Sequence, residues 1–271
     1  MAPVCLSRIR PRGESGCSLE GVACQTSQFA PAPAILGSQI ADNVHLERNT
    51  QLTTACAVLW DLDGTLVDSA EQHWLAWHDA LAAAGHKFDR DYLVATFGQR
   101  NDLILRKLLG PDAPNAEIER ISDEKEARFR ALVRKRGLEL LPGAELWLKR
   151  LRAEGWRQAL ATSAPRANAE TMLEVLSLAG YFGAVVAAED VQRGKPDPQV
   201  FLLAAERVDV APYRCIVVED AAAGVAGARS AGMRSIGVGA KHAVLGANLA
   251  VSSLDELPED TFEELLARMD F

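Results

Sequence analysis

Residues 55–69 of this 271-residue chain read ACAVLWDLDGTLVDS, and this stretch decides the fold. Its first six residues form a short apolar run, which is typical of a strand buried on both faces of a parallel sheet. The turn-forming letters DLDGT follow at once. The stretch therefore predicts a buried strand that delivers Asp61 and Asp63 into the loop at its carboxyl end.

Strand and helix patterns alternate in the second half of the chain. We expect strands near residues 158–161, 184–187, 215–218 and 235–238, and helices near residues 144–153, 167–178, 198–208 and 221–231. Such alternation predicts a parallel sheet with helices on both faces. A final amphipathic helix is expected over residues 254–271.

A long helical stretch interrupts this alternation just after the first strand. Its first helix places apolar residues at helical spacing, namely Trp74, Trp77, Leu81 and Ala84. The charges of residues 117–136 alternate in sign, which is typical of a solvated helix face. We therefore expect an α/β fold: a doubly wound parallel sheet formed by residues 55–69 and 142–271, with a small inserted α-helical cap domain over residues 70–141.

The first 54 residues differ from the rest in composition. They mix Pro, Gly, Ser and Gln without a sustained apolar period, so we expect a disordered or poorly structured extension. Arginines at positions 8, 10 and 12 are a weak indication of organelle targeting, which two nearby glutamates dilute. Whether this extension belongs to the mature protein is left open.

Composition excludes several classes of function. With 37 acidic and 29 basic residues the formal charge is -8, a poor match for nucleic acid or an anionic membrane. No apolar run approaches the roughly 20 residues of a membrane span. The five cysteines form no CxxC pair and are typical of reduced thiols. We expect a cytoplasmic protein, monomeric or weakly dimeric.

Polar residues follow four of the predicted strands at one edge of the sheet, where ligands bind in such folds. Besides the two aspartates of the first loop, these residues are Thr162, Ser163, Lys195, Glu219 and Asp220. Acids gathered at a dry strand end repel one another unless a cation neutralises them. Oxygen ligands without His or Cys indicate Mg²⁺, and a carboxylate beside such an ion can attack phosphorus.

Four motifs in this order resemble those of the haloacid dehalogenase superfamily. WDLDGTLVDS at residues 60–69 is similar to the DxDGT signature of its phosphotransferases. LATS at 160–163, GKPDP at 194–198 and VVEDAAAG at 217–224 follow at suitable separations. The resemblance covers residues 55–239, and four ordered motifs make it far more specific than a lone DxD.

The resemblance implies a role for each matching residue. Asp61 would be the nucleophile and Asp63 the general acid/base. Phosphate would be bound by Thr162, Ser163, Lys195 and the tight turn at Gly64. Magnesium would be held by Asp61, Asp63 (through its backbone carbonyl), Glu219 and Asp220.

The helical stretch carries further signals for the substrate. SAEQH at residues 69–73, with Ala76 and Trp77, resembles the corresponding stretch of β-phosphoglucomutases, which implies that His73 aligns the acid/base and the sugar. The alternative is a histidine packed at the edge of the helical core. The loop at residues 97–100 resembles the substrate-specificity loop of the same subfamily, and makes Arg100 a candidate substrate contact.

Departures from the mutase pattern put a substrate with two phosphates in doubt. Arg100 lies one residue nearer its glycine than the mutase arginine does, and Phe97 replaces a lysine. Pro165 stands where a basic residue would grip the second phosphate. Arg166, next along the chain, is a candidate contact for a substrate anion.

We therefore expect a Mg²⁺-dependent phosphatase of a small phosphorylated metabolite, a sugar or polyol phosphate, acting through an aspartyl-phosphate on Asp61. The alternative is a β-phosphoglucomutase, in which the phosphoryl group passes from the aspartate to a second sugar hydroxyl. A remote alternative is a non-catalytic phospho-acceptor or binding protein, similar to a receiver domain. The helical insertion and the acid two residues after Asp61 speak against it.

Overall fold

The structure is a computed structural model that describes residues 55–96 and 98–267. The described residues belong to one compact unit, Val44–Phe271. The predicted extension over residues 1–54 lies outside the described residues, as do Phe97 and the last four positions. Within the described ranges, no helix combines the length and the apolar character that crossing a membrane requires.

A six-stranded parallel sheet forms the centre of the fold, in the order β5-β4-β1-β6-β7-β8. Its strands are β1 Ala57–Trp60, β4 Arg157–Ala161, β5 Ala184–Val186, β6 Cys215–Glu219, β7 Arg234–Val238 and β8 Leu249–Val251. The chain winds outward from β1 in one direction through β4 and β5, and in the other through β6, β7 and β8. The predicted doubly wound parallel sheet is confirmed, and its switch point lies at β1.

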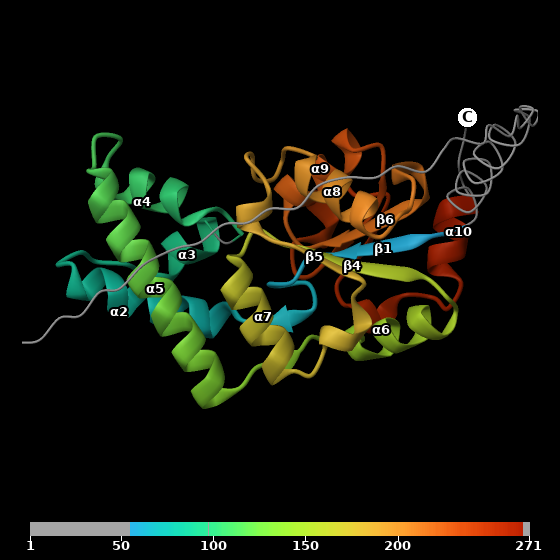
Figure 1. Ribbon diagram of the computed structural model, residues 1–271, viewed down its shortest axis with the longest axis horizontal. Coiled ribbons are helices and arrows are strands. Elements are labelled where there is room, and N and C mark those ends of the chain that lie inside the picture. Colours follow the sequence, from blue (N-terminus) through green and yellow to red (C-terminus); the bar gives the residue numbers. More distant parts are fainter. Residues whose placement is uncertain (1–54, 97, 268–271) are drawn as a thin grey trace, which may run out of the picture. The chain divides into compact units, whose positions relative to one another are not determined.

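Two apolar clusters pack on the two faces of the sheet. Val58 and Trp60 of β1 contribute to the cluster under α6 (Ala144–Ala153) and α7 (Arg166–Val175), whereas Ala57 and Leu59 contribute to the cluster under α8 (Gln199–Arg207) and α9 (Ala222–Ser230). Figure 1 shows these helix pairs on opposite sides of the sheet. Every residue of β1 is buried because helices cover both faces.

The C-terminal part differs from the expectation of one long helix. After the edge strand β8, a short 3₁₀ turn at Leu254–Glu256 precedes α10, which covers only Thr261–Ala267. Pro258 lies between them, and proline cannot continue a helix that has already begun. The prediction of a continuous helix from residue 254 is therefore wrong.

Four helices follow β1 and form their own apolar cluster. They are α2 Ala70–Ala83, α3 Arg90–Thr96, α4 Asn101–Leu109 and α5 Asn115–Arg136, called here the helical segment. Trp77 and Leu81 of the predicted stripe are buried in this cluster, and Trp74 packs at its edge. The one contact unit includes this segment together with the sheet, so the boundaries of a separate cap domain stay a prediction.

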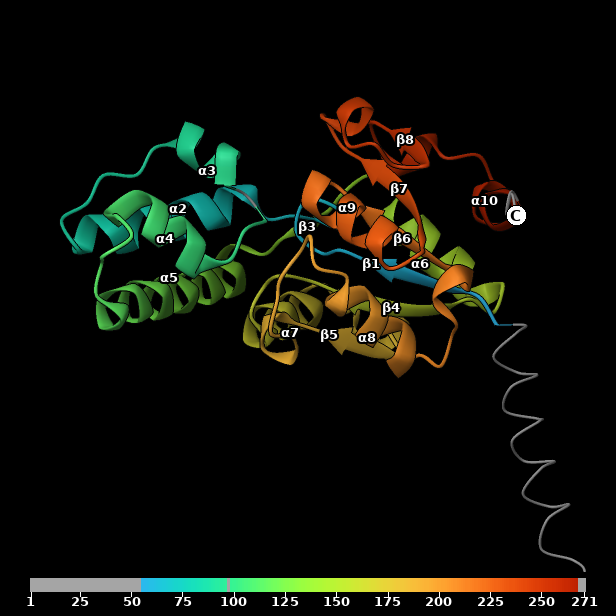
Figure 2. The same ribbon diagram turned by 90° about the horizontal axis from the view of Figure 1, so that it is seen from above.

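The two connections between the sheet and the helical segment pair with each other. β2 (Val67–Asp68) precedes α2, and β3 (Glu139–Leu140) follows α5. They form a short antiparallel ladder, with Val67 opposite Leu140 and Asp68 opposite Glu139. Figure 2 shows β3 between the helical segment and the sheet. Neither short strand was expected from the sequence.

Candidate active site

Adjacent strands place Asp61 and Glu219 side by side. The backbone N–H of Asp61 donates to the carbonyl oxygen of Val218 at 3.0 Å, which extends the pairing of β1 with β6 by one residue. Lys195 Nζ then donates to Asp61 Oδ1 at 2.6 Å and to Glu219 Oε1 at 2.5 Å. A buried ammonium thus bridges acids from two strands, as the strand-end prediction requires.

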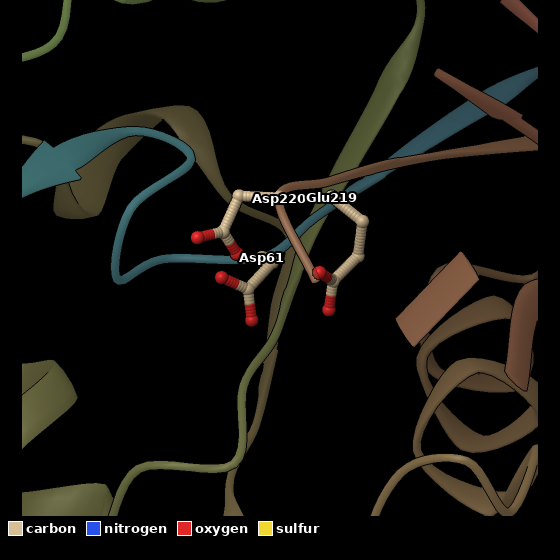
Figure 3. A group of neighbouring side chains, drawn as sticks. All are labelled: Asp61, Glu219 and Asp220. Carbon is tan, nitrogen blue, oxygen red and sulfur yellow. The ribbon is translucent and has the colours of Figure 1, made fainter. Parts of the chain in front are cut away.

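Three carboxylates come close enough together to hold a metal ion. One oxygen each of Asp61, Glu219 and Asp220 lies within 4.8 Å of the other two (Figure 3). Burial raises the pKa of Asp61 well above its ordinary value and raises the pKa of Asp220 to about 7, and the neighbouring acids add to both effects. The raised pKa values mean that Lys195 compensates these acids only in part. An all-oxygen set that favours further positive charge fits a hard cation such as Mg²⁺.

Lys195 remains charged in this position. Burial alone would lower its pKa, but the carboxylates of Asp61 and Glu219 outweigh burial and raise the pKa. Its side chain is 6% exposed, so its charge acts in surroundings that screen it little. It is therefore a fixed positive charge next to the predicted nucleophile.

Gly224 allows Glu219 to reach this position. A Cβ atom at residue 224 would lie 1.9 Å from Glu219 Oε1, so no larger residue fits without moving that carboxylate. The other oxygen, Oε2, accepts a hydrogen bond from the backbone N–H of Ala221 at 2.8 Å. The glycine that ends the VVEDAAAG motif thus leaves the space that the glutamate within the motif occupies.

Asp63 lies in a separate set of contacts. Its Oδ1 accepts a hydrogen bond from Ser69 Oγ at 2.5 Å and lies 3.0 Å from His73 Nε2. Burial would raise the pKa of Asp63, but its contacts with His73 and Ser69 and the charge of Lys125 outweigh burial and lower it. Its carboxylate is outside the three-acid group described above. This leaves the side chain available for acid/base work, whereas its predicted part in metal binding concerned the backbone carbonyl.

His73 combines the two interpretations considered for it. Its ring stacks on Phe129 with centroids 4.0 Å apart, which is a packing role, while Nε2 faces Asp63. Its other nitrogen, Nδ1, lies 3.0 Å from Lys125 Nζ. An ammonium can only donate, so Nδ1 must accept and the ring proton must be on Nε2, directed at Asp63.

Lys125 and the adjacent Glu126 were missed in the sequence. Their side chains are 3% and 9% exposed, so the expectation that the charges of residues 117–136 are all solvated is wrong for this pair. Lys125 Nζ donates to Glu126 Oε1 at 2.8 Å. A signal was present, because Lys125 occupies a place in the apolar stripe that runs through Ile121 and Phe129.

The remaining predicted phosphate-binding residues follow β4, apart from Gly64, which lies in the loop after β1. Thr162 is buried, and its hydroxyl oxygen accepts a hydrogen bond from the backbone N–H of Ala164 at 3.0 Å. Gly64 has φ +82°, which favours glycine, but its N–H donates to the carbonyl oxygen of Val67. The turn forms as expected, although this amide is already used within it.

One cavity of about 1070 Å³ brings nearly all of these residues together. The predicted site residues that line it are Asp61, Asp63, Gly64, His73, Arg100, Thr162, Ser163, Lys195, Glu219 and Asp220. Arg100 also pairs with Asp102 at 3.1 Å. Arg166 is not among the lining residues, because its guanidinium pairs with Asp190 and its backbone N–H donates to Glu189. A substrate contact through Arg166 is therefore not supported by its position.

Comparison with known proteins gives matches over the part of the chain that contains this site. A family model described as haloacid dehalogenase-like hydrolase matches residues 57–232. The β-phosphoglucomutase of Bacillus subtilis (strain 168) is 36% identical over 214 residues, which cover 77% of this chain and 94% of that protein. A fructose-1-phosphate phosphatase of Escherichia coli (strain K12) is 32% identical over 185 residues, covering 67% and 95%.

Solved structures give the same result. The crystal structure of a β-phosphoglucomutase from Clostridium difficile superposes with a TM-score of 0.72 at 27% identity, over 79% of this chain and 98% of that one. The matched length includes both the sheet and the helical segment. The arrangement of the two is therefore shared with a protein of known structure.

Proposed function

The chain belongs to the haloacid dehalogenase-like hydrolases, and from this premise we propose that it is a Mg²⁺-dependent phosphatase of sugar or polyol phosphates. The observation that carries the proposal is the meeting of Asp61, Asp63 and Lys195 in one cavity. A nucleophile, a proton carrier and a fixed cation are thereby within reach of one phosphate group. This is the set of groups that hydrolysis of a phosphate ester requires.

Asp61 is the nucleophile in this proposal. One of its carboxylate oxygens forms a bond to phosphorus while the bond between phosphorus and the ester oxygen breaks. Lys195, the hydroxyl of Thr162 and the backbone N–H of Ser163 offset the charge on the phosphoryl oxygens. Magnesium held by Asp61, Glu219, Asp220 and the carbonyl of Asp63 would supply further charge neutralisation.

Asp63 moves the proton in both half-reactions. It protonates the departing alcohol oxygen and then takes a proton from the water that hydrolyses the aspartyl-phosphate. Its lowered pKa keeps it ionised in the free protein at neutral pH. A negatively charged ester bound beside it favours protonation, and this supplies the acid form that the first step needs.

The helical segment acts as a cap in this proposal. It contributes His73, Arg100 and Lys125 to the cavity, so residues outside the sheet contact the alcohol part of the substrate. Closure of such a segment excludes water and completes the site. The cytoplasmic location and the monomeric or weakly dimeric state remain predictions.

A β-phosphoglucomutase is the second candidate, favoured by the similarity to the Bacillus subtilis enzyme. A mutase must hold a second phosphate while the first one reacts. Pro165 occupies the position expected for a basic residue, and Arg166 is bound by Asp190. These features support the hydrolase.

The test is a measurement of phosphate release over a panel of sugar and polyol phosphates with Mg²⁺. We expect turnover of at least one of them by the wild type and none by Asp61→Asn. Incubation with β-glucose 1-phosphate and a trace of the bisphosphate separates the two candidates. Glucose 6-phosphate as the main product would favour the mutase. A phospho-enzyme that forms but does not turn over would instead support the non-catalytic alternative.

A further inference from the structure

Glu126 connects the helical segment to the sheet domain through a buried hydrogen-bond network. Its Oε1 accepts hydrogen bonds from Lys125 Nζ at 2.8 Å and from Asn101 Nδ2 at 2.7 Å. Its Oε2 accepts a short hydrogen bond from Asn168 Nδ2. The three donors lie on α5, α4 and α7, so a single carboxylate joins two helices of the segment to a helix on the sheet.

Asn168 is well placed for this connection. It is fully buried near the start of α7, and its Oδ1 accepts a hydrogen bond from Arg130 Nη1 at 2.9 Å. Glu126 and Arg130 are four residues apart on α5 and therefore lie on the same face of that helix. Figure 1 shows α5 running beside α7. The side-chain amide of Asn168 thus donates one hydrogen bond to α5, at Glu126, and accepts one from it, at Arg130.

The same carboxylate determines where the ammonium of Lys125 lies. That ammonium lies between Glu126 Oε1 and His73 Nδ1, at 2.8 Å and 3.0 Å. Without a negative charge at residue 126, the buried ammonium of Lys125 loses its counter-ion and is driven out of this position. Its departure removes the donor that holds the His73 proton on Nε2, toward Asp63.

We propose that Glu126 is a positioning residue, which aligns Asp63 for proton transfer when the helical segment is docked on α7. It acts through Lys125 and His73 and does not contact the reacting atoms. The hydrogen bond from Asn168 holds Glu126 in place, and Glu126 in turn holds Lys125 and His73 in place. The proposal rests on the proposed phosphatase function, because it assigns Asp63 the task of protonating the leaving alcohol.

The test uses leaving groups that differ in their need for a proton. A sugar phosphate releases an alkoxide that must be protonated, whereas 4-nitrophenyl phosphate releases a stable anion. The value of kcat/KM reports the steps up to departure of the leaving group. We expect Glu126→Gln to lower kcat/KM for the sugar phosphate by about 10- to 100-fold, a part of the roughly 100- to 10,000-fold that general acid catalysis supplies, and for the nitrophenyl ester by less than about threefold.

Two further variants separate alignment from simple attachment of the segment. Asn168→Ala removes the connection between Glu126 and α7, and we expect the same selective loss in smaller measure. Thr171→Val is the matched control, because it removes a hydrogen bond between the same two helices that involves neither Glu126 nor Asn168, from Arg134 Nη2 at 3.1 Å, together with a bond inside α7. It should affect both substrates equally and by little.

Equal losses on both substrates in Glu126→Gln, or no loss on either, would overturn the proposal. The ¹⁵N spectrum of the His73 ring gives an independent measurement, since the proton should be on Nε2 in the wild type and redistribute in the variant. Unchanged ring nitrogens in Glu126→Gln would also overturn it. If the wild type hydrolyses neither ester, the proposed function fails instead, so the two failures are distinguishable.

Discussion

Replacing Asp220 by asparagine should make the metal-free protein more stable while it abolishes activity. Burial and the adjacent charge of Glu219 raise the pKa of Asp220 from 3.8 to about 7. In the unfolded chain this carboxyl loses its proton near pH 4. Above that pH the folded protein must either retain the proton or accept a buried, incompletely compensated charge. Asparagine has nearly the same shape and carries no charge.

The size of the effect follows from the displaced pKa. A rise of about 3 units corresponds to about 4 kcal/mol, because each unit is worth about 1.4 kcal/mol. A folded pKa above the unfolded value means that this carboxyl reduces stability as the pH rises from about 4 to about 7. The gain from Asp220→Asn should therefore be near zero at pH 4 and reach about 2 to 4 kcal/mol at pH 8.

Urea unfolding in EDTA at several pH values between 4 and 8 measures this gain. The matched control is Asp190→Asn, because interaction with Arg207 and Arg166 lowers the pKa of Asp190 to about 2. There the stabilising effect of the carboxylate is complete above about pH 4 and is lost as the pH falls through about 2. The control should lose about 1 kcal/mol at pH 8, since both arginines are more than a third exposed. A destabilised Asp220→Asn at pH 8, or a gain that does not depend on pH, would refute the reasoning.

Three more predictions concern the same site. Asp61→Asn should reduce phosphate release at least about a thousandfold, because no other group can form the covalent intermediate; acid-quenched protein should carry no phosphate, and wild-type-like turnover would exclude the mechanism. Mg²⁺ binding, followed by calorimetry, should weaken about tenfold per unit below pH 7, since the ion must displace the proton of Asp220; a flat profile would contradict this. Gly224→Ala should displace Glu219 and lower kcat about tenfold or more. Ala223→Ser, at an exposed position, should not lower kcat. Equal activities of the two variants would show that Glu219 can make room for the added methyl group without loss of function.

Much of the site could be predicted from the sequence because its chemistry is local to strand ends. The apolar run before DLDGT predicts a buried strand. The carboxyl ends of all strands in a parallel sheet lie at the same edge, where ligands bind. Asp61, Lys195, Glu219 and Asp220 therefore meet as expected. Each prediction needed only the position of its own strand along the chain and not the order of the strands in the sheet.

The residues that sequence reasoning missed depend on contacts between elements. Whether Lys125 is solvated or buried is determined by the face that α5 turns toward α2 and α7, which the pattern of charges does not encode. Arg166 is turned away from the cavity by Asp190, which lies 24 residues further along the chain. The apolar run of the edge strand β8 is only three residues long (LAV) and partly exposed, so it was too short to predict a strand.

The ladder between β2 and β3 has a consequence for how this architecture can vary. Because Val67 pairs with Leu140, the chain leaves the sheet domain and returns to it at the same place. The residues between these two points are an insertion in the sheet fold, because the chain re-enters the fold next to where it left. An engineer could exchange this insertion for a foreign module, or a short turn from Asp68 to Glu139, without rerouting one strand of the host. Substrate preference can therefore change with the segment, but any replacement must again supply a contact such as that of His73 with Asp63.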